Sequence, residues 1–436
     1  METYNFISLA GIFILLGLAW LLSTNRKQMN WRVIFWGIGL QVLFALFIFV
    51  LPIGSKIFLF INNIIVKVLE SAGAGTQFVF GRLALPPGTT SDTGEKSLGF
   101  ILAFQGLATV IFFSALMSIL YYFRIMPLMI RGFAYVFTKL MHISGAESLC
   151  TSSNIFVGVE SPLTIRPYLD RMTKSELTTI LTASMATIAS SVMALYVFML
   201  QDVFPTIAGH LVSASVLSAP AALVMSKILY PETGEPETLG EHIKPEYTKE
   251  SSFLEAIING ANTGVKLVLA IVALLLAFLG LVALLDLIFG GVGGWINNLL
   301  GWRIDWTLKG LLGYLFYPIT LILGVPPADA VQVARIIGER TVVTEVTSYQ
   351  DLAVLLQQGV LKHPRSIVIC TYALTGFAHV ASLAIFIGGI SALAPNRTRD
   401  LAALGPRALL AATLACLMTA AIAGTFFNNA SILLGS

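Results

Sequence analysis

Two carboxylates in segments that contain helix-breaking residues are the side chains of this sequence whose types and spacing could do chemistry. Glu160 lies two positions before Pro162, within the stretch SNIFVGVESPL. Glu345 lies in a second interrupted segment, Gly324–Gln350, which also carries prolines near its start. An ionisable side chain inside a strongly apolar chain is costly enough that function is the default hypothesis. We therefore expect Glu160 and Glu345 to accept hydrogen bonds from a small polar molecule.

The composition predicts that these carboxylates lie inside a membrane. The chain has 436 residues, of which 56% are hydrophobic and 11% are charged, and its mean hydropathy is +0.85. A soluble domain carries roughly 25% charged residues, so much of this surface must face lipid. The net charge is only +3, and basic residues do not alternate with aromatic ones as single-strand binding requires. We therefore expect the lipid bilayer as a partner and no nucleic acid.

Eight stretches are long and apolar enough to cross a bilayer, since a spanning helix needs about 20 mostly apolar residues. They are Phe6–Leu22, Val33–Leu51, Leu98–Tyr122, Glu176–Leu200, Ile207–Leu229, Val265–Phe289, Ser366–Leu393 and Ala408–Phe427. Two further apolar stretches, Ile57–Leu69 and Met126–Met141, carry charged residues and suit helices that lie in the interface.

The interrupted segments occupy corresponding places in two halves of the chain. The polar linker Pro231–Ser252 separates the halves, and the interrupted segments are Gly145–Thr173 and Gly324–Gln350. Each is followed by a span rich in small and hydroxyl residues. Paired breaks of this kind are the sequence sign of a secondary-transporter binding site. Carbonyls freed at such breaks, together with an Asn or Thr oxygen, can replace the water around a sodium ion.

Structural interpretations of the same residues stay open. Serines and threonines within spans often serve only to pack helices together. Arg166 could be a structural partner of Glu160, and Glu339 with Arg340 could form a paired or solvated hairpin tip. His379 could either satisfy a hydrogen bond within the helix bundle or contact a substrate, and a histidine titrates near neutral pH.

Five long stretches carry a resemblance to a known family: Ser153–Leu169, Thr173–Val192, Gly338–Leu352, Gly376–Ser382 and Ala394–Gly424. Together they resemble the concentrative nucleoside transporters, which couple nucleoside uptake to sodium or protons, and the similarity covers nearly the whole chain. The resemblance implies an all-α polytopic membrane protein that assembles as a homotrimer. An inverted-repeat transport domain with two re-entrant hairpins and two broken helices would lie on a trimerisation scaffold.

The resemblance also implies a division of the chain and a set of site residues. Residues 1–85 would form the N-terminal scaffold region, 96–200 the first hairpin and gate-like region, and 201–436 the transporter region with the second hairpin. The substrate-binding positions would be Glu160, Val192, Glu345, Phe377, His379 and Ser382. The sodium ligands would be the side chains of Asn154 and Thr187 and the carbonyls of Val157 and Ile188.

Three departures from the family pattern bear on the substrate. The motif Gly158–Pro162 reads GVESP, where the family usually has Gly-Gln-Thr/Ser-Glu-Ala/Ser-Pro, so it lacks the glutamine and is one residue shorter. His379 and Thr344 stand where the family usually has asparagine. A buried polar site rejects analogues that leave its groups unpaired, so we expect an altered base preference.

The sequence therefore predicts a secondary active transporter that imports nucleosides by symport with sodium across the plasma membrane, here a bacterial inner membrane. The alternatives are a proton-coupled symporter of nucleosides or a related polar metabolite, and a non-transporting membrane sensor. An enzyme is not expected, because no Ser–His–Asp set, metal-spaced cluster or phosphate-binding loop is present in the sequence. Sodium, or a proton, is the coupling ion expected, with no covalently bound cofactor.

Overall fold

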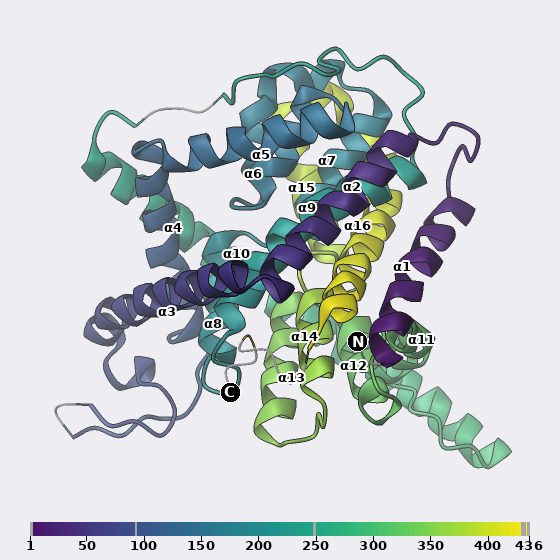
Figure 1. Cartoon of the computed structure of the whole chain (residues 1–436). Helices are drawn as coiled ribbons and strands as arrows, with labels where there is room; N and C mark the ends of the chain where they lie inside the picture. The colour runs from purple at the N-terminus through teal and green to yellow at the C-terminus, as the bar shows by residue number, and fades with distance from the viewer. Residues whose placement is uncertain (1–2, 92–93, 247–249, 429–432, 434–436) are drawn as a thin grey trace.

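The computed structural model describes residues 3–91, 94–246, 250–428 and 433, and its regular structure in these ranges is helical (Figure 1). The α-helices are α1 (Thr3–Leu21), α2 (Trp31–Ala45), α3 (Pro52–Phe80), α4 (Gly106–Tyr122), α5 (Ile125–Met141), α6 (Gly145–Asn154), α7 (Lys174–Ala186), α8 (Ser190–Leu200), α9 (Ile207–Leu229), α10 (Phe253–Leu300), α11 (Leu308–Ile322), α12 (Pro327–Arg340), α13 (Glu345–Gln357), α14 (Pro364–Ala373), α15 (Val380–Leu393) and α16 (Thr398–Phe426). Tighter or wider helical turns occupy Leu46–Val50, Gly81–Ala84, Ser161–Arg171 and Pro395–Arg397.

The described residues contain seven helices that are long and apolar enough to cross a membrane, or eight if α4 and α5, bent by 76°, count as one span. The prediction of an all-α polytopic membrane protein is therefore confirmed. Two expected spans are wrong in detail, because Glu176–Leu200 and Ser366–Leu393 each consist of two helices with a break between them. The span expected from Leu98 begins only at Gly106, and the short apolar helix α11 was not expected.

The two stretches expected to lie in the interface belong to well-formed helices. Ile57–Leu69 is the central part of the 29-residue helix α3. Met126–Met141 is almost all of α5, which turns sharply away from α4. Figure 1 shows both helices running at a steep angle to α1 and α16. Their position at the interface stays a prediction.

The core is built from two halves with the same order of elements. In the first half, hairpin 1 (residues 145–171, which contain α6) is followed by the first broken span, α7 and α8, and then by the long helix α9. In the second half, hairpin 2 (residues 327–357, α12 and α13) is followed by the second broken span, α14 and α15, and then by α16. The helices α9 and α16 pack against each other at the centre, and α7 and α14 pack against both.

The first broken span owes its break to a contact with hairpin 1. A capping box of Thr173 and Glu176 starts α7. The helix ends at Ala186, and the Ser190 N–H, at the start of α8, donates to the carbonyl of Phe156 at 3.0 Å. A backbone partner outside the span thus replaces a hydrogen bond that a continuous helix would make.

The second broken span owes its break to a glycine that lies against the first. Gly376 has a φ of +104°, and a Cβ placed on it would lie 2.6 Å from the carbonyl carbon of Ala186. Only glycine adopts this conformation without strain and permits this approach. The two breaks therefore meet in the middle of the core.

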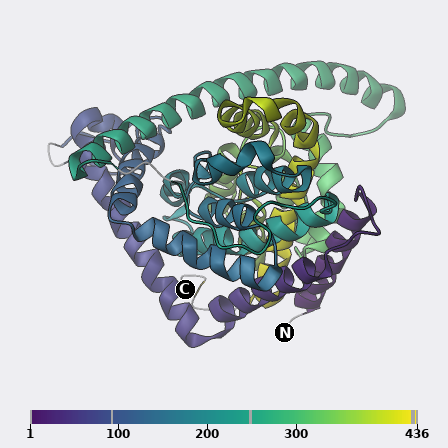
Figure 2. The same ribbon diagram turned by 90° about the horizontal axis from the view of Figure 1, so that it is seen from above.

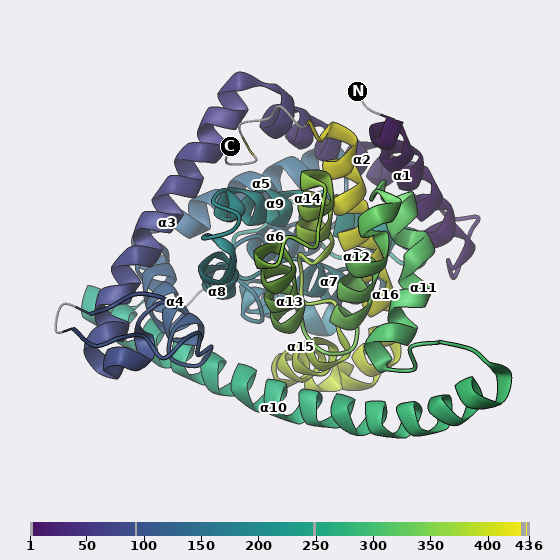
Figure 3. The same ribbon diagram turned by 90° about the horizontal axis from the view of Figure 1, so that it is seen from below.

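An outer group of helices surrounds the core on two sides. Seen from above and from below, α3 runs along one side and α10 along another, and both converge near α4 (Figures 2 and 3). The 48-residue helix α10 packs on α4 through Gly260 and Gly264, where added Cβ atoms would lie 2.7 Å from the Cα atoms of Ala115 and Ile111. Small residues at this spacing allow close approach of two helices in lipid.

A buried arginine ties the N-terminal helix to the second half. Arg365, at the start of α14, is 2% exposed. It donates to the carbonyls of Gly324 (2.8 Å), Tyr4 (2.7 Å) and Gly424 (2.8 Å), and to Asn5 Oδ1 (3.0 Å). Several acceptors around one guanidinium offset the cost of burying its charge.

A carboxylate joins hairpin 2 to the loop before α14. Asp329 accepts hydrogen bonds from the N–H groups of Lys362 (3.0 Å) and His363 (3.1 Å) and from Ser366 Oγ (2.6 Å), and His363 Nδ1 lies 3.0 Å away. Burial by itself raises the pKa of a carboxyl group, but these donors favour its ionised form. They hold the pKa of Asp329 below its usual value.

Candidate functional site

Glu345 is the centre of a buried polar cluster at the start of α13. Thr344 caps this helix by accepting from the Thr347 N–H at 3.5 Å, and Glu345 is 3% exposed. Its Oε1 accepts a hydrogen bond from the Tyr196 hydroxyl at 2.6 Å, and its Oε2 lies 2.8 Å from His379 Nε2. Hairpin 2 and both broken spans therefore each contribute one residue to the cluster.

The orientation of His379 follows from its place at the N-terminus of α15. Its Nδ1 accepts a hydrogen bond from the Ser382 N–H at 3.2 Å, so the proton of the neutral ring is on Nε2, which faces Glu345. Ser382 Oγ in turn lies 2.8 Å from the His379 carbonyl and also contacts the carbonyl of Phe377. His379 therefore has the structural role that the sequence left open, and its contact with a substrate stays a prediction.

Tyr196 belongs to this cluster although the sequence analysis did not single it out. Its ring stacks on that of Tyr349 with the centroids 4.4 Å apart. Tyr196 lies four residues after Val192 in α8, and residues at that spacing share a helix face. Val192 is 2% exposed, so the position expected under a base is apolar and buried. Helical spacing from Val192 places Tyr196 on the same face of α8, but it does not show that this face meets hairpin 2.

A second polar cluster surrounds Asn154, the last residue of α6. Asn154 Nδ2 donates to the carbonyl of Cys150 at 3.0 Å and to Ser184 Oγ at 3.3 Å. Because a carbonyl can only accept, these bonds fix the amide orientation. The amide oxygen then faces Ser161 Oγ at 2.6 Å. Hairpin 1 thus holds a buried, neutral oxygen near the break of the first broken span.

The other expected cation ligands lie at that break or in the turn of hairpin 1. Thr187 is 1% exposed and its Oγ1 donates to the Ala183 carbonyl at 2.9 Å. Ile188 is also 1% exposed, and Val157 is half-buried. Within the described ranges, no hydrogen bond reaches the carbonyl oxygen of Val157 or Ile188. Free carbonyls and an amide oxygen are the kinds of group that suit a sodium ion.

Gly158 connects hairpin 1 to both broken spans. A Cβ added to Gly158 would lie 3.0 Å from the Ala189 Cβ and 3.9 Å from Phe377 Cε2. Phe377 is itself half-buried. The turn of hairpin 1 therefore packs directly against the two breaks, and a movement of one requires a response from the other.

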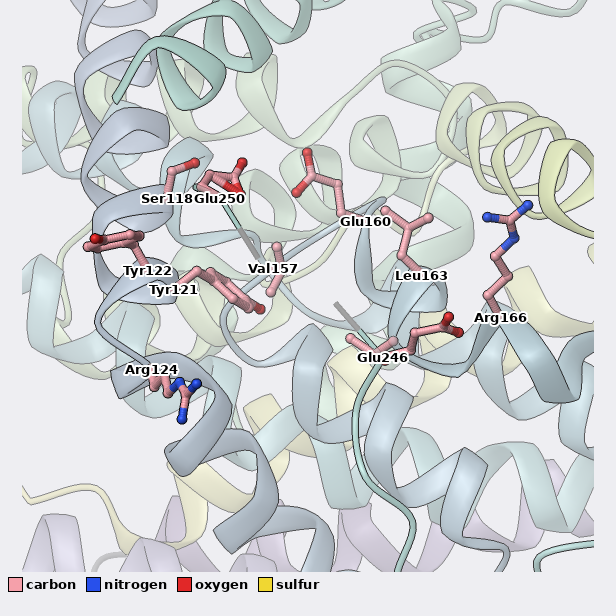
Figure 4. Close-up of a pocket in the computed structure, with 11 residues that line it drawn as sticks. Ser118, Tyr121, Tyr122, Arg124, Val157, Glu160, Leu163, Arg166, Glu246 and Glu250 are labelled. Atoms are coloured by element: carbon pink, nitrogen blue, oxygen red, sulfur yellow. The ribbon is translucent and has the colours of Figure 1, made fainter. Parts of the chain in front are cut away.

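Glu160 faces a cavity of about 300 Å³ between α4, hairpin 1 and the polar linker (Figure 4). The lining residues are Ser118, Tyr121, Tyr122, Arg124, Val157, Glu160, Leu163, Thr164, Arg166, Glu246 and Glu250. Glu160 is exposed, and in the described part of the chain its carboxylate has no hydrogen bond or ion pair. Glu160 therefore presents a free acceptor to the cavity.

The charged residues that could have paired near the two hairpins have different partners and different burial in the structure. Arg166 lines the same cavity as Glu160, but no ion pair joins the two among the described residues. Glu339 pairs with Lys309 at 2.7 Å. Arg340 is fully buried, so the interpretation of a solvated hairpin tip is wrong for this residue. The helix α12 carries its last side chain into the core.

Glu160 and Glu345 have different surroundings. Glu345 is enclosed by Tyr196 and His379, whereas Glu160 faces the open cavity. No contact between the two glutamates is found in the described ranges. A substrate that contacts both remains a prediction.

The three cysteines are free and buried, as expected for small core residues. Over the described residues, no group of three or more His, Cys, Asp or Glu side chains could hold a metal ion.

Comparison with protein families accounts for most of the chain. Residues 210–424 match the family model described as the Na+ dependent nucleoside transporter C-terminus, and residues 10–83 match the corresponding N-terminus. Residues 103–203 match a model named Gate and described as nucleoside recognition.

Individual relatives agree with these matches. The chain is 38% identical to an uncharacterized transporter of Haemophilus influenzae over 97% of each chain. It is 35% identical to the nucleoside permease NupC of Helicobacter pylori, with 97% of this chain and 98% of that protein covered. It is also 38% identical to mouse solute carrier family 28 member 3, of which it spans 58%.

A solved structure has the same fold. The structure of CNTnw in an inward-facing substrate-bound state matches with a TM-score of 0.86 and 34% identity, over 97% of this chain and 98% of that one.

Proposed function

The chain belongs to the family of Na+-dependent nucleoside transporters, and we propose that it imports nucleosides by symport with sodium. The observation that carries this proposal is the junction of hairpin 1, hairpin 2 and both broken spans. There, Glu345 with its donors lies in the same core as Asn154 and the free carbonyls of Val157 and Ile188. One group suits a polar ligand and the other a cation.

Coupling between these two groups requires that cation and nucleoside stabilise the same arrangement of the breaks. The packing of Gly158 on Ala189 and Phe377 supports this, because it joins the cation side to the substrate side. In this proposal, Glu345 accepts hydrogen bonds from ribose hydroxyls. Glu160, which faces the cavity, accepts from a base edge, with Val159 in place of an amide neighbour.

Uptake into liposomes tests this function. Purified protein is reconstituted, and labelled uridine and adenosine are offered with an inward sodium gradient, an inward proton gradient, or neither. Accumulation with sodium alone is expected, and it should be lost in Glu345→Gln but kept in Glu339→Gln. The second variant is the matched control, because Glu339 is a partly exposed member of an ion pair on the same hairpin.

The same assay decides between the alternatives. Accumulation with protons alone would favour a proton-coupled symporter, for which His379 beside Glu345 is the motivating observation. No accumulation of either nucleoside by folded protein would refute nucleoside symport. It would favour a related polar metabolite or a non-transporting sensor.

We further propose that the protein is a homotrimer in the plasma membrane. The support is the large apolar surface of the outer helices, since only 6% of the most apolar window of α10 is buried within one chain. Mass measurement of the intact protein released from detergent micelles tests this. A monomeric mass under conditions that preserve transport would refute it.

A further inference from the structure

Ser161 touches the candidate cation cluster and the turn of hairpin 1 at the same time. It follows Glu160 directly and is fully buried. Its Oγ lies 2.6 Å from Asn154 Oδ1 and 2.9 Å from the carbonyl oxygen of Gly158. Neither the expected substrate positions nor the expected sodium ligands include it.

The hydroxyl of Ser161 has one proton and two acceptors. Asn154 Oδ1 can only accept, since the Cys150 carbonyl fixes the amide with Nδ2 on the other side. The Gly158 carbonyl can also only accept. One proton cannot serve both acceptors fully, so the bond to Asn154 and the bond to Gly158 compete.

We propose that Ser161 is a further ligand of the transported sodium ion and the residue that relays its presence to hairpin 1. The inference rests on the proposed sodium symport. A cation at Asn154 Oδ1 disfavours a hydroxyl proton pointing at the same oxygen. The Ser161 hydroxyl then donates its hydrogen bond to the Gly158 carbonyl and turns a lone pair toward the cation. No covalent bond is made or broken.

The relay follows from what surrounds Gly158. This residue packs against Ala189 in the first broken span and near the ring of Phe377 in the second. Two residues further on is Glu160, which faces the cavity. A full hydrogen bond from Ser161 to the Gly158 carbonyl tightens the turn that positions Glu160. Sodium thereby orders the substrate side of hairpin 1 without touching the substrate.

The position of Ser161 between Glu160 and Pro162 gives it this place. In GVESP, the serine directly follows the glutamate and starts the tight helical turn Ser161–Arg171. A purely local role would need only the bond to Gly158, which is a common turn contact of serine. The additional contact with Asn154, seven residues earlier and at 2.6 Å, is what a local turn does not require.

Sodium-dependent thermal stability of the purified full-length protein tests the proposal without relying on transport. Melting is followed while sodium chloride replaces choline chloride at constant ionic strength, for wild type, Ser161→Ala, Ser161→Cys and Ser152→Ala. The Ser152 hydroxyl is also fully buried, and it has no hydrogen-bond partner within the described chain. Ser152→Ala therefore controls for loss of a buried hydroxyl near Asn154.

The sodium concentration at half-maximal stabilisation is expected to rise about tenfold or more in Ser161→Ala, a cost typical of removing a group around a metal site. Ser161→Cys keeps the volume but replaces a hard oxygen by a soft sulfur, so it should show a similar rise and serves if the alanine variant melts without cooperativity. Ser152→Ala should stay within twofold of wild type. Nucleoside affinity should also lose part of its sodium dependence in both Ser161 variants.

A midpoint for Ser161→Ala and Ser161→Cys within twofold of wild type would overturn the role of Ser161 and leave sodium symport standing. An equal rise in Ser152→Ala would overturn it as well, because the effect would then be one of general packing. If sodium neither raised the melting temperature of the wild-type protein nor drove nucleoside uptake, the proposed symport and this inference would both be overturned.

Discussion

Replacing Glu345 by glutamine should damage the buried cluster whichever way the new amide turns. The carboxylate has two acceptor oxygens, one for the Tyr196 hydroxyl and one facing His379 Nε2. If the amide nitrogen faces His379, two donors oppose each other. The histidine cannot respond by moving its proton to Nδ1, because Nδ1 accepts from the Ser382 N–H. If the amide nitrogen faces Tyr196, the tyrosine hydroxyl loses its acceptor.

Either orientation leaves one buried donor without a partner, which costs about 1–3 kcal/mol. At about 1.4 kcal/mol per factor of ten, the population of the ordered cluster falls roughly 5- to 140-fold. We expect a lower melting temperature for Glu345→Gln and a loss of nucleoside accumulation of the same order. Thermal unfolding in detergent and uptake into liposomes measure the two effects.

A double-mutant cycle separates this explanation from simple loss of charge. His379→Asn removes the constraint on the ring proton, because an asparagine amide can present either its oxygen or its nitrogen. The Glu345→Gln/His379→Asn double variant should therefore be destabilised by less than the sum of the single variants. Additive effects, or a Glu345→Gln protein that melts and transports like wild type, would refute the hydrogen-bond reasoning. Glu339→Gln, whose ion pair is partly exposed, should cost less than about 1 kcal/mol.

Three other substitutions test the architecture. Gly376→Ala should destabilise the protein by about 2 kcal/mol or more, since strain at φ +104° adds to a clash with Ala186. Gly359→Ala, at φ +64° in open space, is the control and should cost less in the same melting assay. Equal effects would show that the contact between Gly376 and Ala186 is unimportant. Arg365→Met should lower the free energy of unfolding by about 3 kcal/mol or more, because several buried acceptors lose their partner. An unchanged melting temperature would contradict the role of Arg365 in tying α1 to the second half. The pKa of Asp329 is lowered in the folded protein, so the stability it contributes is complete above about pH 4, the unfolded value, and is lost as the pH falls below it. Between pH 6 and pH 3, the melting temperature should therefore fall less steeply in Asp329→Asn than in wild type. Identical slopes would exclude this carboxyl as a cause of the loss of stability in acid.

The membrane class and the paired interrupted segments could be predicted from sequence because they depend on local composition. Pro162 and Pro327 lie in the first turn of their helical segments, where proline is favoured, so they mark where these segments begin. Ile207–Leu229 was predicted with the bounds that α9 has, since this stretch is apolar and is followed directly by a proline-containing loop.

The position of the break in the first broken span could not be predicted from local composition, because Glu176–Leu200 contains neither proline nor glycine. Its cause is the bond from the Ser190 N–H to the Phe156 carbonyl, which exists only once hairpin 1 is in place. In the second span, Gly376 marks a possible break in the sequence, but glycine is required there because the backbone of Ala186 approaches it closely. Tertiary contacts placed both breaks.

The candidate site could be predicted only in part, because some of its contacts also depend on tertiary packing. Glu345, His379 and Ser382 were expected in one site, and the structure brings them together. Their contact with Tyr196 depends on how α8 faces hairpin 2, which no local pattern specifies. Glu160 was expected with Glu345, but it faces the cavity instead. The direction in which Glu160 faces depends on how hairpin 1 packs, which composition does not encode.

The long helix α10 has a consequence for the energy of any movement of the core. Its 48 residues extend about 72 Å, more than twice the thickness of the hydrocarbon layer. Its buried residues are Ala256, Gly260 and Gly264 near its start, then Leu275, and then Gly293 near its end. Between Leu275 and Gly293 no residue of α10 is fully buried, although Asp286 in this stretch accepts a hydrogen bond from the Leu308 N–H at 2.6 Å. A movement of the core against α10 would therefore disturb fully buried residues of this helix mainly near its two ends.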